Sequence, residues 1–250
     1  MELAPALTLC GILATRAIEC FPELLKIKKA LRTLALGYYA YRCVRLKVTR
    51  GACFPPEAVM ALRFRPKLDK IVELLLYLAH VRPGADKYQA VKFFYLADRE
   101  HLNRYGRPIT FENYYALSYG PVASKALDLL EDDARVLKEA GIDRLPFETE
   151  VGKLPNGNDT VYLRKPLRQV NYELFSKSDL NIFDDVVRKY RNASFDDLFK
   201  LTHKHYAYTK AWSTRKQGNR AEMFYEEMID DEKKRAALVE ELLPVASHMQ

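Results

Sequence analysis

The sequence predicts an α+β fold that is mainly α-helical: a compact helical domain with a short strand and a β-hairpin, winged-helix-like in part. Three observations predict this fold class. Apolar residues recur at helical spacing through much of the chain after residue 66, and residues 109–119 alternate with a period of two. Two strand-like segments also flank a loop rich in Gly and Asn at residues 152–159.

The composition of the chain changes near residue 60, where we place a domain boundary. Residues 1–65 hold eleven Lys or Arg and four Glu, whereas residues 66–250 hold 29 basic and 29 acidic residues. We therefore predict a domain over residues 60–245, preceded by a basic extension, residues 1–59, that is either an accessory segment or the result of a mis-assigned start. The balanced charge of the body argues against a surface that neutralises phosphates.

All four cysteines lie in this extension, and their spacings match no Cys-x-x-Cys metal pattern. They are Cys10, Cys20, Cys43 and Cys53. Free thiols in a reducing cytoplasm are the simplest interpretation. No stretch of 18 or more apolar residues occurs, so we expect no membrane span.

The first two elements of the domain are expected to be helices. Leu68, Ile71 and Leu75 recur at helical spacing, which predicts an amphipathic helix over residues 67–80 that ends at Arg82-Pro83-Gly84. Asp86 is a plausible N-cap for a second helix, which reaches about Leu102. That helix is apolar nearly all round, so it should be central and buried.

A strand over residues 109–119 should follow, because its side chains alternate, and Gly120-Pro121 should then break it. Proline at a first helical turn predicts that a helix with Ala126 and Leu130 starts there. Residues 147–151 and 160–163 predict the β-hairpin.

Helical spacing returns after the hairpin. It predicts a helix from about Leu180 to Tyr190, and Ser194-Phe-Asp-Asp197 resembles a capping box that starts the next one. A last charged segment, from Arg220 to about Leu243, is expected to form a helix over the surface.

Asp98 is the strongest single candidate for a special role, because it lies on the apolar stripe of the second helix. A buried carboxylate must be hydrogen-bonded or neutralised. One hypothesis is that Asp98 accepts bonds from backbone amides of the following turn or of the Tyr119-Gly120-Pro121 corner. The other is that it faces a groove and binds a partner. If its bonds are buried, replacement by alanine should cost on the order of 1 to 3 kcal/mol.

Tyr114, Tyr115 and Tyr119 are further candidates, because tyrosine is enriched at protein interfaces, although half of an alternating strand must face the core. Gly120 and Pro121 are interpreted as architectural. His203 and His205 stand two apart without a third ligand at a supporting distance, so we predict no metal site. The chain also lacks a Gly-x-Ser-x-Gly elbow and a phosphate-binding Gly-rich loop, so we predict neither enzymatic activity nor a cofactor.

The segment from Tyr95 to Val122 resembles the Panacea domain of SocA-like antitoxins, a family that includes phage-associated GepA-like proteins. The resemblance rests on Tyr95-Leu-Ala-Asp98, Gly106-Arg-Pro-Ile-Thr110, the tyrosine strand and Tyr119-Gly120-Pro121-Val122. Thr202, His203 and Trp212 match a later Thr-His and Trp of that family. The resemblance spans residues 64–240.

The resemblance implies a bacterial or prophage-associated antitoxin that neutralises a toxin by direct protein binding. Its partner would be a cognate toxin, encoded by an adjacent gene. A further partner implied by the family is a Clp-type protease, to which the antitoxin would deliver the toxin as an adaptor. Two alternatives stay open: a winged-helix-like DNA-binding regulator, and a scaffold that the basic extension tethers to RNA or to a membrane surface.

Overall fold

The computed structural model of the protein describes residues 62–154, 157–216 and 218–248. The predicted extension over residues 1–59, with its four cysteines, lies outside the described residues. Helix α4 (Leu68–Val81) and helix α5 (Lys87–Tyr105) come first, as predicted. The Asp86 carboxylate caps α5, because it accepts a bond from the backbone N–H of Gln89 at 2.9 Å.

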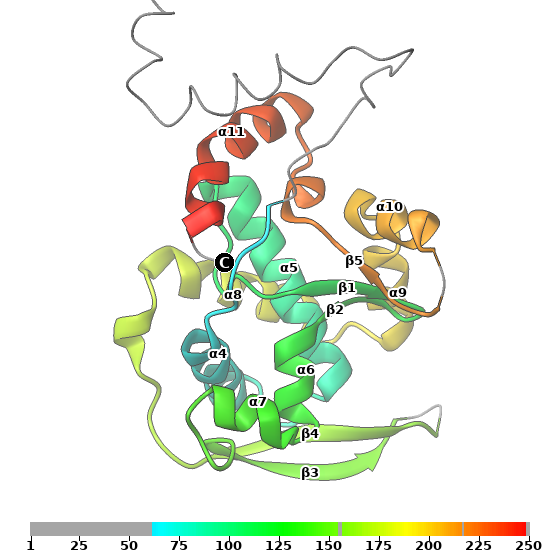
Figure 1. Cartoon of the computed structure of the whole chain (residues 1–250). Helices are drawn as coiled ribbons and strands as arrows, with labels where there is room; N and C mark the ends of the chain where they lie inside the picture. The colour runs from blue at the N-terminus through cyan, green and yellow to red at the C-terminus, as the bar shows by residue number, and fades with distance from the viewer. Residues whose placement is uncertain (1–61, 155–156, 217, 249–250) are drawn as a thin grey trace, which may run out of the picture. The chain divides into compact units, whose positions relative to one another are not determined.

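Helix α5 forms the centre of the domain, and the strands and the other helices surround it (Figure 1). It continues three residues beyond the expected end at Leu102, because Gly106 supplies the left-handed C-cap with a φ of 75°. Most side chains along its first four turns are buried, as expected for a helix that is apolar nearly all round.

The tyrosine strand is shorter than predicted, and it belongs to a three-stranded antiparallel sheet. Strand β1 (Tyr114–Leu117) lies between β2 (Gly120–Ala123) and β5 (Ala221–Glu222). Residues 109–113 form no strand. Two of their backbone N–H groups, those of Ile109 and Thr110, bond to a side chain instead of a neighbouring strand.

The expectation that Gly120-Pro121 breaks the strand and starts a helix is wrong. The chain reverses at residues 118 and 119, and Gly120 and Pro121 pair with Leu117 and Ala116 as the start of β2. Gly120 has a φ of 99°, which suits the tight turn, and β2 is an edge strand, where a proline without an N–H is tolerated. Helix α6 (Ser124–Leu130) starts only after β2.

Helix α7 (Ala134–Glu139) and the predicted hairpin follow α6. The hairpin pairs β3 (Phe147–Lys153) with β4 (Asp159–Pro166), and each strand is longer than expected. An isolated bridge between Tyr162 and Asp86 attaches β4 to the start of α5. Figure 1 shows this hairpin below α6 and α7, apart from the three-stranded sheet.

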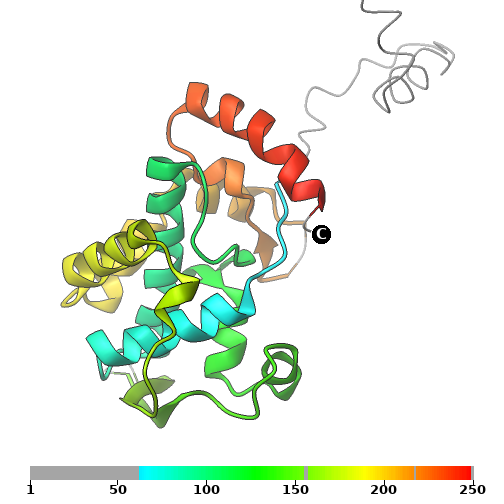
Figure 2. The ribbon, with the colours of Figure 1, turned by 90° about the vertical axis from the view of Figure 1, so that its left-hand side faces the viewer.

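The C-terminal half begins with a 3-10 turn, η1 (Tyr172–Leu174), and the predicted helix α8 (Lys177–Tyr190). Helix α9 (Phe195–Thr202) then starts at the predicted capping box, in which Ser194 and Asp197 exchange bonds. Helix α10 (Tyr206–Thr214) completes this region. Helix α8 packs against α5, as Figure 2 shows from the side.

The prediction of a single surface helix from Arg220 onward is wrong for the first part of this segment. That segment contains β5, then a 3-10 turn, η2 (Tyr225–Met228), and only then α11 (Glu232–His248). The backbone N–H of Met223 donates to Tyr114 O at 2.9 Å, and the side chains of Met223 and Tyr225 are buried. Pairing with β1 therefore overrides the helical preference of this segment.

A buried ion cluster ties α4, α5 and α8 together. The Asp179 carboxylate, at the start of α8, lies 2.8 Å from Lys70 Nζ, 3.1 Å from His101 Nε2 and 2.7 Å from the Arg107 guanidinium. Burial alone would raise the pKa of Asp179, but the bonds from His101 and Lys70 hold it well below its usual range.

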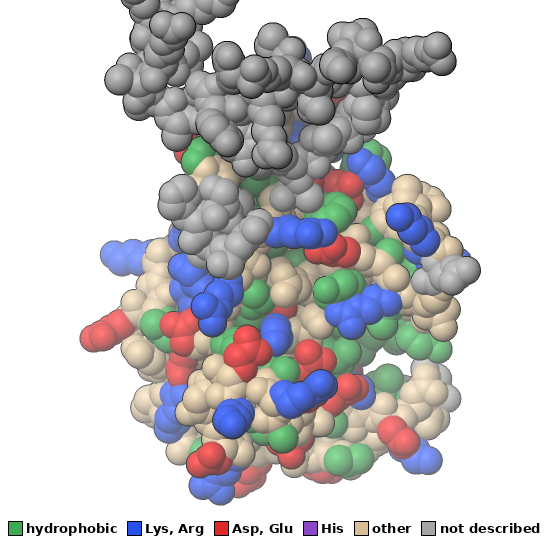
Figure 3. Space-filling model, viewed as in Figure 1, with side chains coloured by type: hydrophobic (Ala, Val, Ile, Leu, Met, Phe, Trp, Pro, Cys, Tyr) green, Lys and Arg blue, Asp and Glu red, His purple; other side chains and the backbone are tan. Residues whose placement is uncertain are grey.

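On the face in Figure 3, acidic and basic side chains are interspersed, without an extended patch of one sign.

Candidate functional site

Asp98 is the centre of a buried hydrogen-bond network between α5 and the loop that leads into β1. Its Oδ1 accepts from the backbone N–H of Ile109 at 2.8 Å and of Thr110 at 3.1 Å. Its Oδ2 accepts from the Thr110 hydroxyl at 2.6 Å and the Tyr114 hydroxyl at 2.9 Å. Burial raises the pKa of Asp98, while these bonds act in the opposite direction. With 1% of its surface exposed, Asp98 holds this loop in the core.

Glu112 is a second buried carboxylate that the sequence reasoning missed. It accepts from the backbone N–H of Lys125 at 3.1 Å and of Ala126 at 2.9 Å. These groups are unsatisfied donors in the first turn of α6, so Glu112 caps that helix from a distant position. Burial raises the pKa of Glu112 to about 8 although these bonds lower it. The local sequence carries no signal for such a cap.

Lys92 lies next to Gly120 and Pro121, at the start of β2, and the sequence reasoning missed it as well. Its side chain is 0% exposed, and Nζ donates to Pro121 O at 2.7 Å. The Tyr88 ring lies 4.8 Å from Nζ, and no salt bridge to Lys92 is found in the described part of the chain. The sequence did contain a signal for this residue, because a lysine within a helix that is apolar nearly all round is expected to be buried. Burial lowers the pKa of this ammonium to about 7.

Gly120 occupies a position that leaves no room for a side chain. A Cβ atom there would lie 2.8 Å from Lys92 Nζ, 2.9 Å from Thr202 Oγ1 and 3.2 Å from His203 Cε1. The end of α9 therefore packs directly against the backbone of the β1–β2 hairpin. Glycine is required here both by its φ of 99° and by this close approach.

Thr202 and His203 lie at the end of α9, next to the turn of the β1–β2 hairpin. The Thr202 hydroxyl donates to Leu198 O at 2.8 Å. The His203 ring stacks on Phe199 with a centroid separation of 3.7 Å, and its Nε2 lies 3.3 Å from Ser118 O. Among the described residues no group of three potential metal ligands is found around this or any other histidine.

The structure separates the candidate residues into groups. Asp98 and Tyr114 share the buried network. The corner cluster, by which we mean one buried lysine and the residues packed around it, contains Lys92, Gly120, Pro121, Thr202 and His203. Tyr119 lies in the turn beside this cluster. Tyr115 lies apart, half-buried, and its ring faces the Arg220 guanidinium at 3.5 Å.

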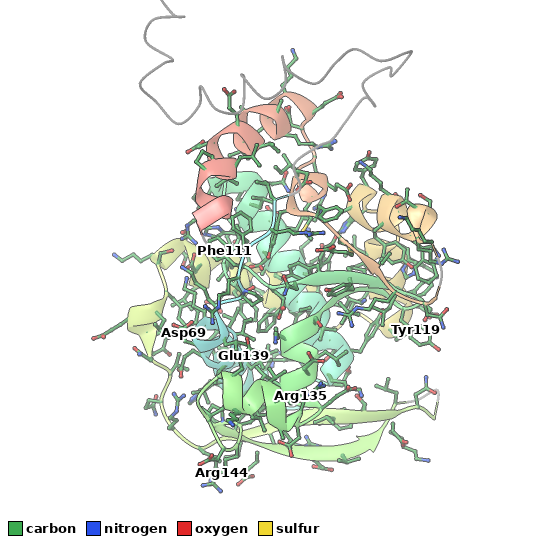
Figure 4. The ribbon with its side chains drawn as sticks, in the orientation of Figure 1. Asp69, Phe111, Tyr119, Arg135, Glu139 and Arg144 are labelled. Carbon is green, nitrogen blue, oxygen red and sulfur yellow. The ribbon has the colours of Figure 1, made fainter. Side chains whose placement is uncertain are left out.

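An aromatic row extends from the corner cluster along the surface, and it consists of Tyr119, Phe195, Tyr88 and Phe199. The Phe195 ring lies 5.8 Å from Tyr119, 4.4 Å from Tyr88 and 6.0 Å from Phe199. Tyr119 is 54% exposed, and Figure 4 shows it at the end of the hairpin, beside α9. The row therefore presents exposed aromatic surface on a fixed backbone.

The buried charge of Lys92 yields a prediction about the pH dependence of stability. Because the folded-state pKa, about 7, lies below the usual 10.5, the unfolded chain binds more protons between these values. The contribution of Lys92 to stability therefore rises as the pH increases from 7 to 10.5. We expect the parent protein to gain stability relative to Lys92→Met over this interval, by at most about 1.4 kcal/mol per pH unit.

Urea denaturation of both proteins at several pH values measures this difference. Lys87→Met is the matched control, because Lys87 lies on the same helix but pairs with Glu131 at the partly exposed surface. If the difference in stability between the parent protein and Lys92→Met did not change with pH, this result would contradict the lowered pKa of Lys92.

Comparison with known proteins identifies the central part of the chain. Residues 91–213 match the family model described as antitoxin SocA-like, Panacea domain. No curated protein and no solved structure gave a match. No helix within the described residues is long and apolar enough to cross a membrane. The matched segment includes Asp98, the β1–β2 hairpin and the Thr202-His203 pair, so residues 91–213 of this chain form an antitoxin SocA-like, Panacea domain.

Proposed function

We propose that this protein is an antitoxin that neutralises a cognate protein toxin by direct binding, without catalysing a reaction. The match of residues 91–213 to the SocA-like family carries this proposal. The position of the motif supports it, because Tyr119 is exposed at the turn of the β1–β2 hairpin, while Gly120 and Pro121 beside it are buried. The toxin would be the product of an adjacent gene.

The proposed contact surface is the aromatic row, with Tyr119 as its most exposed member. Lys92 holds the hairpin through Pro121 O, and His203 lies against Ser118 O at the turn. Aromatic side chains on a fixed backbone lose little conformational entropy on binding, so they are effective anchors. Occlusion of the toxin by this face is the mechanism that we propose.

Growth rescue tests the proposal. The full-length protein and the product of the adjacent gene are expressed under separate control, and we expect that product alone to stop growth and co-expression to restore it. A harmless neighbour, or toxicity that co-expression leaves unchanged, would contradict the antitoxin function. Steep salt dependence of binding to the upstream promoter would instead favour the DNA-binding regulator.

Tyr119→Ala locates the contact surface. We expect this change to weaken binding of the toxin by about tenfold or more, because exposed tyrosines at the centre of an interface are common hot spots. Tyr172→Ala is the matched control, since Tyr172 is 53% exposed but lies in η1. Equal affinities of the two variants, measured by calorimetry, would contradict a role of the aromatic row.

The level of the toxin in the same cells separates occlusion from delivery to a protease. Occlusion predicts that the toxin persists while growth recovers. Delivery predicts that its level falls, and that deletion of the Clp-type protease restores both the level and the toxicity.

A further inference from the structure

A surface groove adjoins the aromatic row, between the start of α5 and the start of α9. Its volume is about 520 Å³, in the range of pockets that hold small ligands or large side chains. The groove is lined by Asp86, Tyr88, Gln89, Leu154, Ala193, Ser194, Phe195 and Asp196. Phe195 belongs both to this groove and to the aromatic row, so the two surfaces are continuous.

The side chains that line the groove are acidic or uncharged, and the buried Lys92 ammonium, 4.8 Å from the centroid of the Tyr88 ring, is not among them. Two of its lining residues are carboxylates, Asp86 and Asp196, and none of them is a lysine or arginine. Asp196 is exposed and takes part in no ion pair within the described ranges. Burial, followed by the charges of Asp86 and Asp196, raises the pKa of the Tyr88 phenol, so both carboxylates act on the same ring.

The partial positive charge of the two helix N-termini does not cancel this charge. At α5, the N-cap Asp86 already accepts from Gln89 N at 2.9 Å. At α9, the capping box is complete without Asp196, because Ser194 and Asp197 bond each other's backbone N–H. Asp196 therefore adds a negative charge that the helix cap does not require.

One wall of the groove is aromatic. The Tyr88 and Phe195 rings contact each other there, with centroids 4.4 Å apart and planes 30° from parallel. Arginine is the side chain whose planar, always charged group stacks on aromatic rings and binds carboxylates through two parallel bonds. A primary ammonium supplies the charge without the plane, and an anion would be repelled.

We propose that this groove receives one arginine side chain of the partner protein, with the guanidinium between the Tyr88–Phe195 rings and the Asp196 carboxylate. This inference rests on the proposed function for the identity of the partner as a toxin. It adds the chemistry by which that partner is recognised: a basic anchor next to the contact made by Tyr119.

The test is a nuclear magnetic resonance titration of the 15N-labelled full-length protein with acetyl-arginine-N-methylamide. We expect the backbone amide signals of Ser194, Phe195 and Asp196 to shift in a saturable way. The citrulline analogue has almost the same shape but no charge, and we expect it to bind about fivefold more weakly or worse. Absence of shifts in this segment up to the solubility limit of the probe, or equal binding of both probes, would overturn the proposal.

Asp196→Asn should weaken binding of the arginine probe by about fivefold. Asp69→Asn is the matched control, because Asp69 is also an exposed second residue of a helix, α4, far from Tyr119 in Figure 4. Equal effects of the two variants would overturn the assignment. If growth is rescued but the probe does not bind, the arginine site in the groove is wrong and the antitoxin function stands. If the probe binds but growth is not rescued, only the antitoxin function is wrong.

Discussion

Replacement of Asp98 by alanine is expected to lower the free energy of unfolding by about 3 to 5 kcal/mol. The change leaves four buried donors without their acceptor: the N–H groups of Ile109 and Thr110 and the hydroxyls of Thr110 and Tyr114. Each unsatisfied buried donor costs about 1 to 3 kcal/mol, and relaxation of the loop recovers part of the sum. The expected loss therefore exceeds the 1 to 3 kcal/mol that sequence reasoning alone suggests.

Chemical denaturation of the full-length protein measures this loss, with Asp98→Asn as the conservative comparison. Asparagine keeps one oxygen for the two backbone N–H groups, and the two hydroxyls can rotate to accept from its amide. We expect this variant to lose about half as much stability as Asp98→Ala. A loss below about 1 kcal/mol for Asp98→Ala would contradict the buried network.

Gly120→Ala is expected to cost about 2 to 4 kcal/mol of stability. A φ of 99° is strained for alanine, and the added methyl group would lie 2.8 Å from Lys92 Nζ and 2.9 Å from Thr202 Oγ1. Neither neighbour can move away freely, because Lys92 donates to Pro121 O and Thr202 to Leu198 O. The variant must therefore separate the hairpin from α9 or displace the buried ammonium.

Gly141→Ala is the control for Gly120→Ala in the same denaturation experiment. Gly141 also has a positive φ, 71°, but nothing lies within 4 Å of its added methyl group. We expect this variant to lose only about 1 kcal/mol, the cost of the left-handed conformation. Equal losses for the two glycine variants would contradict the close approach of α9 to the hairpin.

Local signals in the sequence predicted most of the helices correctly. Asp86 caps α5 and Ser194 starts α9 through interactions that span three residues, so a short stretch of sequence contains both partners. The hairpin of β3 and β4 was equally accessible, since two strand-like segments and their loop are contiguous. The buried position of Asp98 followed from its place on the apolar stripe of α5.

The prediction failed where long-range pairing determines the conformation. Pro121 alone suggested a helix start, but pairing with Ala116 makes it part of an edge strand. Ala221 and Glu222 lie in a charged segment that suggested a helix, and they pair with residues more than a hundred positions earlier. Such contacts leave no periodic pattern in residues 120–123 or 221–222.

The sequence by itself therefore determined most of the helices and the β3–β4 hairpin, because these depend on neighbours within a few turns of the chain, and its motifs carried the family resemblance. Only the tertiary structure decided which residues meet at the candidate site: Lys92 beneath Gly120, Glu112 at the start of α6, and Phe195 between Tyr88 and Tyr119. The physical reason is that a buried charge or a close backbone contact is defined by the groups around it, and those groups come from segments that only folding brings together.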